Sequence, residues 1–124
     1  MHPLTDAFIK GRPKYKKITK HYVDAKKDKV IGACHIGVLL SEIYGIKTEL
    51  QAYEAYQKIK KDFPEFHGTW VSVPCEDTGE QTGFVGSILV HLNDDHDGRS
   101  GWSDKNVATW LDSALTQAKA SLNS

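Results

Sequence analysis

Apolar side chains recur every three or four residues along most of the chain, which is the spacing of amphipathic helices. A short helical turn is expected over residues 5–10, with Thr5 as its N-cap. Thr48 and Ser103 are suitable N-caps for two of the longer helices. The pattern predicts these longer helices over residues 13–25, 49–63, 83–92 and 104–122.

Residues 30–44 differ, because they are apolar on nearly every side and include small residues at positions 32, 33 and 37. A helix that is apolar all round is buried among its neighbours. Gly45 follows as a left-handed C-cap. We therefore expect residues 30–44 to form a central helix with the other helices packed around it.

Residues 64–82 interrupt the helical spacing. Within them, residues 70–73 alternate and are β-branched, which predicts one minor strand that ends before Pro74. A chain of 124 residues builds one core but not two ordinary domains. The sequence thus predicts a single domain over 1–124 that is all-α or mainly α, a compact bundle of four to five helices with one irregular segment. Residues 1–12 are the candidate for a loosely packed N-terminal segment.

The composition is that of a globular domain, with 40% hydrophobic and 26% charged residues. No apolar run reaches the roughly 18–20 residues that cross a bilayer, so no membrane partner is expected. Residues 1–6 have no cationic stretch leading into an apolar one, which argues against a secretory signal. Cys34 and Cys75 are too few for a disulfide framework. We interpret them as reduced thiols in a cytoplasmic protein, and a disulfide between them stays an open alternative.

The net charge is zero, but the two signs are unevenly distributed. Residues 10–29 hold nine Lys and Arg against two Asp, whereas residues 76–112 hold eight Asp and Glu against two Lys and Arg. Such a dipole can steer partners, and it is also typical of solvated helix surfaces. The candidate contacts for a protein partner, or for the phosphates of a nucleic acid, are Lys14, Lys16, Lys17 and Lys20.

The segment between the last two predicted helices has the spacing of a calcium-binding loop. With Gly98 at the sharp turn, a loop of this kind places its ligands at Asn93, Asp95, Asp97 and Asp104. Three features argue against calcium binding. The first ligand, Asn93, is not Asp, and the last, Asp104, is not Glu. Ser100 stands where such loops have an apolar residue. The favoured interpretation is a polar turn between antiparallel helices, with calcium as the one candidate cofactor.

Three further side chains of this loop are candidates for contact with a ligand or partner. They are His96, Arg99 and Trp102. Trp102 also stands just ahead of the Ser103 cap, where an apolar residue commonly acts as a hydrophobic staple.

A thiol enzyme is a further alternative, because Cys34-His35 opens an apolar helix whose dipole would favour a thiolate. A cysteine nucleophile needs a base and an orienting carboxylate. The candidates for these two roles are His67, His91 and His96, with Asp77 or Asp95. No local spacing fixes such a triad, so a buried structural cysteine is the favoured interpretation.

Several short motifs resemble a group of small uncharacterised proteins from bacteriophages and actinobacteria. These proteins carry a Cys-x-x-Gly-Ala-Leu-like helix, a Leu-Asn-Asp turn and a closing Trp-Ser…Val-x-x-Trp-Leu helix. The matching motifs here are Cys34-His35-Ile36-Gly37-Val38-Leu39, Leu92-Asn93-Asp94, Trp102-Ser103 and Val107-Ala108-Thr109-Trp110-Leu111. The chain departs from the pattern in its acidic 95–97 insertion and in residues 70–82. The resemblance implies a phage-type accessory protein and implies no reaction.

The first functional expectation is therefore a non-enzymatic accessory protein that binds a host protein through its charged faces. A calcium- or small-ligand-binding module that uses the 93–104 loop is the second. Nucleic-acid binding through the basic segment 10–29 is the third, and a Cys34-dependent enzyme is the fourth.

Overall fold

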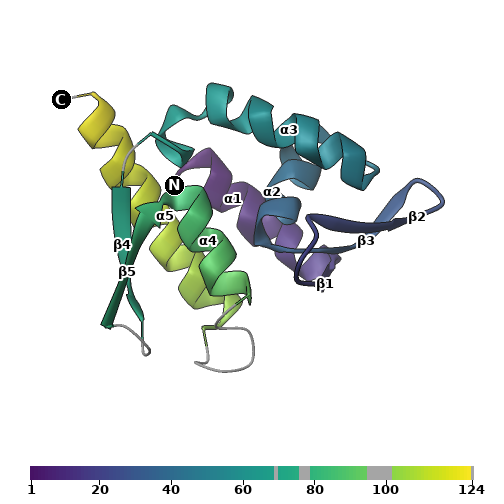
Figure 1. Cartoon of the computed structure of the whole chain (residues 1–124), viewed down its shortest axis with the longest axis horizontal. Helices are drawn as coiled ribbons and strands as arrows, with labels where there is room; N and C mark the ends of the chain where they lie inside the picture. The colour runs from purple at the N-terminus through teal and green to yellow at the C-terminus, as the bar shows by residue number, and fades with distance from the viewer. Residues whose placement is uncertain (69, 76–78, 95–101, 124) are drawn as a thin grey trace.

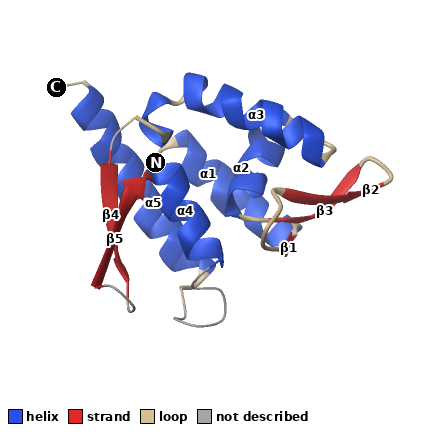
Figure 2. Ribbon diagram, in the orientation of Figure 1, coloured by secondary structure: helices blue, strands red, loops and turns tan. Residues whose placement is uncertain are grey.

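The computed structural model describes residues 1–68, 70–75, 79–94 and 102–123, which combine α-helices with two small sheets (Figures 1 and 2). The helices are α1 (Pro3–Gly11), α2 (His35–Tyr44), α3 (Glu49–Asp62), α4 (Val85–Asp94) and α5 (Asp104–Leu122), with short 3-10 helices η1 (Arg12–Lys14) and η2 (Pro64–Phe66). The strands are β1 (Lys16–Lys17), β2 (Val23–Lys26), β3 (Lys29–Ala33), β4 (Trp70–Cys75) and β5 (Gly79–Phe84).

The prediction of an all-α bundle is wrong, and the helix expected over residues 13–25 is where it fails first. That segment holds η1, β1 and β2, and it joins β3 in a sheet of order β1-β3-β2. β1 runs parallel to β3, whereas β2 is antiparallel to it. The turn between β2 and β3 has positive φ at Lys27 and Asp28, 52° and 59°, as a two-residue type I′ hairpin requires. The Asn-Gly pair that usually marks such a turn is absent. The helical spacing of the apolar residues nearby therefore led to the wrong prediction of a helix over residues 13–25.

The helix expected over 30–44 is shorter than predicted. Its first residues form β3, Cys34 is the N-cap, and α2 begins at His35. The left-handed C-cap at Gly45 is confirmed, with φ of 63°. α2 packs against α1, α3 and α4, and it also passes close to the chain before β2. A Cβ on Gly37 would overlap the carbonyl group of Tyr22, so glycine is required there.

A second sheet follows η2 and consists of β4 and β5, paired antiparallel from Trp70 opposite Phe84 to Cys75 opposite Gly79. The strand expected near 70–73 is therefore β4, and its partner β5 takes the first two residues of the helix expected over 83–92. This sheet rests on α5, since the indole Nε1 of Trp110 donates a hydrogen bond to the carbonyl of Ser72 at 3.2 Å.

The N-terminal segment is part of the core, so the expectation of loose packing over residues 1–12 is not met. α1 packs against α2 and α5 and buries Leu4 and Phe8 completely. His2 Nε2 lies 2.7 Å from Glu65 Oε2 in a buried pair. The backbone amide of His2 also donates to Asp112 Oδ1 at 2.9 Å.

Candidate functional site

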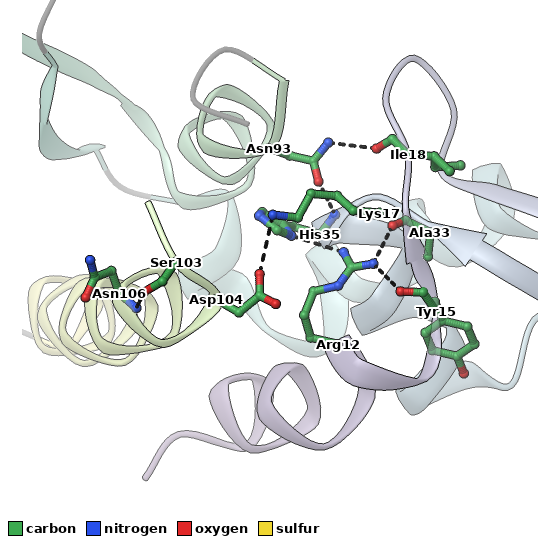
Figure 3. A network of polar contacts seen from close by, with 10 residues as sticks. All are labelled: Arg12, Tyr15, Lys17, Ile18, Ala33, His35, Asn93, Ser103, Asp104 and Asn106. Atoms are coloured by element: carbon green, nitrogen blue, oxygen red, sulfur yellow. Dashed lines mark hydrogen bonds and ion pairs between the residues drawn. The ribbon is translucent and has the colours of Figure 1, made fainter. Parts of the chain in front are cut away.

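A buried arginine organises the chain around the start of α2 (Figure 3). Arg12 is 3% exposed and donates hydrogen bonds to the carbonyl groups of Tyr15 and Ala33, at 3.0 and 2.8 Å. Its guanidinium also lies 3.2 Å from His35 Nδ1. Because a guanidinium can only donate, His35 Nδ1 accepts and the ring proton is on Nε2.

His35 is neutral in this setting. Burial, followed by the charges of Arg12 and Lys17, lowers the pKa of its imidazole to about 3. A neutral ring can accept the hydrogen bond from Arg12, whereas an imidazolium would be repelled by the charges of Arg12 and Lys17. His35 therefore serves as a hydrogen-bond acceptor rather than as a proton donor near neutral pH.

Asn93, at the end of α4, ties three segments together (Figure 3). Its Oδ1 accepts a hydrogen bond from the backbone amide of His35 at 3.0 Å. Its Nδ2 donates to the carbonyl of Ile18 at 2.9 Å and to Asp94 Oδ1 at 2.7 Å. With 1% of its surface exposed, Asn93 uses its amide to fix α4 against α2 and the loop before β2.

A cavity of about 230 Å³ opens beside this junction, at the N-terminal end of α2. Segments distant in the sequence line it, and their side chains include Lys20, His21, Tyr22, Cys34, Tyr53 and Asp94. We name it the Cys34 cavity. It brings a thiol, an ammonium, a carboxylate and two phenol rings to one place, which is a typical setting for a small-ligand site.

A larger cavity, of about 470 Å³, lies between α1 and α5. Apolar side chains such as Phe8, Ile9 and Ala108 form much of its wall. Two buried polar side chains, Thr5 and Arg12, also line it, and Arg12 is already bonded within the protein. This cavity and a still larger one, of about 670 Å³ between the β2–β3 hairpin and the start of α3, both exceed the Cys34 cavity in volume. The convergence of polar and aromatic groups favours the Cys34 cavity, and that chemistry decides our choice of site.

Cys34 caps α2 as a neutral thiol. Its Sγ accepts a hydrogen bond from the backbone amide of Gly37 at 3.4 Å, and it is a free cysteine. Burial raises the pKa of the thiol, and this outweighs the lowering by backbone donors of the first turn. Since the thiolate is the nucleophilic form, the site does not activate Cys34.

Besides the neutral His35, the Cys34 cavity is lined by a second histidine, His21, which was not among the expected bases. Its Nδ1 lies 3.4 Å from Glu49 Oε2, and the other Glu49 oxygen accepts from the backbone amide of Tyr22 at 3.0 Å. Of the three histidines expected as bases, His67 lies in the aromatic row described next, His91 is on α4, and His96 is outside the described residues. No local spacing could link His21 to a helix almost thirty residues later, because the fold creates the pair.

Six rings form a continuous row of contacts that starts at the Cys34 cavity. The centroids of consecutive rings are 5.4, 5.6, 6.5, 4.3 and 5.8 Å apart. In order, the members of this aromatic row are Tyr53, Tyr22, Tyr56, His67, Phe84 and Trp70. Its members come from α3, from the segment before β2, from the residue after η2 and from the adjoining ends of β4 and β5.

The two ends of the aromatic row are its most exposed members. Tyr53 has 57% and Trp70 has 66% of its surface exposed, and the four inner rings are half-buried. Lys60 covers the ring of Tyr56, with its Nζ 5.1 Å from the centroid. Burial and the charge of Lys60 lower the pKa of His67, so its ring is neutral. The row is thus a line of half-buried rings with an exposed aromatic ring at each end.

The four lysines expected to contact a partner do not form one free basic surface. Lys14 Nζ lies 2.8 Å from Glu42 Oε1, and Lys17 Nζ lies 3.5 Å from Asp104 Oδ1. Lys16 is on β1, and Lys20 is at the edge of the Cys34 cavity.

Most of the expected calcium loop lies outside the described residues. This part includes the candidates Asp95, His96, Asp97 and Arg99. Of the loop's remaining candidates, Asn93 is bonded to His35 and Ile18 as above, and Asp104 forms the ion pair with Lys17. Trp102 is half-buried against the core. Within the described part of the chain, no cluster of three or more His, Cys, Asp and Glu is placed to hold a metal ion. Calcium binding stays the alternative to a polar turn.

No protein-family model, curated protein or solved structure matches this chain. The resemblance to phage and actinobacterial proteins rests on its short motifs and stays a prediction. Among the described residues, no helix has the length and apolar character needed to span a membrane.

Proposed function

We propose that this protein is a non-enzymatic binding module that docks a segment of a protein partner along the aromatic row. The observation that carries the proposal is the row itself: six rings in consecutive contact, with Trp70 and Tyr53 exposed at its ends. Trp and Tyr side chains supply much of the binding energy of protein interfaces. Contiguous apolar surface of this kind on a soluble protein typically marks an interaction site.

A protein partner suits the row better than a nucleic acid does. Bases stack on aromatic rings, but single-stranded nucleic acids also require cations along the stacking surface. The chain has no net charge. Lys60 is engaged with the ring of Tyr56, and Lys14 and Lys17 are in ion pairs with carboxylates. The chemistry of the surface therefore favours apolar and aromatic side chains as its ligand.

This proposal keeps the expected class of function but moves the binding surface. The basic segment 10–29, predicted to be the contact surface, is folded into η1 and the three-stranded sheet. That the partner is a host protein is part of the proposal and rests on the resemblance to phage proteins. The alternative of a Cys34-dependent enzyme is less favoured, because burial raises the pKa of the thiol.

The test is to select binders from a random peptide library and to map where they bind by NMR chemical shifts. We expect enriched peptides to carry aromatic and apolar residues and to shift the signals of Trp70, Phe84 and Tyr53. A single-stranded oligothymidine is the competing probe. Peptides that map away from the row, or an oligothymidine that binds on it with peptide-like affinity, would contradict the proposal.

A further inference from the structure

Two side chains of opposite charge line the Cys34 cavity, and neither forms an ion pair with another described residue. Within the described part of the chain, Lys20 forms no ion pair, although Lys14 and Lys17 both do. Asp94 accepts a hydrogen bond from the amide of its neighbour Asn93, at 2.7 Å, and faces no described cation in an ion pair. An ammonium and a carboxylate therefore border one small cavity, each without a counter-ion among the described residues.

The walls between these two charges are mostly uncharged. Tyr22 and Tyr53 meet edge to face, with centroids 5.4 Å apart, and Ile36 and Val90 add aliphatic surface. The thiol of Cys34 lies among them. His21 also lines the cavity, but Glu49 already accompanies its ring at 3.4 Å. Its volume, about 230 Å³, is below the roughly 300–1,000 Å³ typical of drug-sized ligands.

We propose that the Cys34 cavity binds a small zwitterion of α-amino-acid size. Its ammonium group pairs with Asp94 and lies against the tyrosine rings, where a cation is attracted to the π face. Its carboxylate pairs with Lys20, and its apolar side chain packs against Tyr22, Tyr53 and Val90. A simple cation would be repelled by Lys20 and a simple anion by Asp94, so a ligand that carries both charges fits best.

This site is distinct from the proposed function, because it takes a free small molecule and does not need Trp70. The two surfaces share Tyr22 and Tyr53, so a bound zwitterion would lie next to one end of a docked peptide. Trp70→Ala therefore separates the two proposals. It weakens peptide binding and leaves zwitterion binding unchanged.

The test uses leucine and phenylalanine as probes, each compared with its amide, which is only a cation, and its N-acetyl form, which is only an anion. NMR shifts of the backbone amides of Cys34 and His35 and of the Asn93 side chain report occupancy. We expect saturable shifts with the free amino acids. Loss of either charge from the ligand should weaken binding by about tenfold or more.

Two variants remove the matching charges from the protein, Lys20→Met and Asp94→Asn. Each should weaken amino-acid binding by about tenfold or more. The controls are Lys16→Met, a lysine on β1 outside the cavity lining, and Glu54→Gln, an exposed acid on α3. The proposal is overturned if neither amino acid gives a saturable shift, if an amide or N-acetyl form binds as tightly, or if the cavity variants bind like the controls.

Discussion

Asn93 holds the backbone amide of His35 through a 3.0 Å hydrogen bond to its Oδ1, and so joins the end of α4 to the start of α2. Its Nδ2 also donates to the carbonyl of Ile18 at 2.9 Å. Removing a buried partner leaves a polar group unsatisfied at a cost of about 1–3 kcal/mol. We therefore expect Asn93→Ala to lower the free energy of unfolding by about 2–4 kcal/mol in urea titrations.

The matched control is the neighbouring Asp94, which is exposed. Asp94→Ala should change the free energy of unfolding by about 0.5 kcal/mol or less. If the two variants are equally stable, Asn93 does not have the structural role assigned here.

Protonation of His35 should destabilise the fold as the pH falls. The pKa of this imidazole is about 3 in the folded protein, against 6.5 for an unperturbed histidine. Between these two values the unfolded chain binds a proton that the folded chain does not. The contribution of His35 is therefore constant above about pH 6.5 and falls below it by up to about 1.4 kcal/mol per pH unit. The lowered pKa of His67 acts in the same direction.

The measurement is the free energy of unfolding between pH 7 and pH 4, for the wild type and for His35→Gln. Glutamine offers Arg12 an acceptor oxygen but does not titrate. The variant should show a clearly shallower pH dependence. Parallel curves for the two proteins would show that His35 is not held neutral by its surroundings.

Calcium should not stabilise this protein. Asn93 is bonded to His35 and Ile18, and Asp104 is paired with Lys17, so two of the four expected ligands already have partners. We expect the same melting temperature in millimolar calcium and in chelator. A ligand at a hundred times its Kd would add about 2.7 kcal/mol, a shift of several degrees for a domain of this size. A shift of that size, abolished by Asp97→Ala, would establish the loop as a calcium site.

The thiol of Cys34 should react slowly in the native protein. It is 8% exposed, and burial raises its pKa. In a Cys75→Ser background, iodoacetamide at neutral pH should modify Cys34 at least about tenfold more slowly before unfolding than after it. Native-state alkylation as fast as that of a free cysteine would instead restore the thiol-enzyme alternative.

Local signals in the sequence were sufficient for the capped helices. The helices expected over 49–63 and 104–122 are α3 and α5, almost to the residue. Thr48 and Ser103 cap them through hydrogen bonds to backbone amides three residues later, at 3.1 Å in each case. An N-cap followed by an amphipathic stripe involves only residues that are close in the sequence. Such a helix can therefore be recognised without knowledge of the tertiary structure.

The sheets and the site depend on contacts between distant residues. The β2–β3 turn uses Lys27 and Asp28 without the usual glycine, and the apolar run from Val30 gives no sign of where β3 ends. The Cys34 cavity joins side chains from residues 20–22, α2, α3 and α4. Nothing in the spacing of these residues predicts that they meet, because the three-stranded sheet brings them together.

The most direct test of the binding function is the affinity of a selected peptide for row variants, measured by calorimetry. Trp70→Ala and Tyr53→Ala remove the two exposed ends of the aromatic row, and Ile31→Ala, 40% exposed on β3, is the matched apolar control. We predict that each row variant raises the Kd by about tenfold or more and that the control leaves it unchanged. Equal affinities for all three variants would contradict the account.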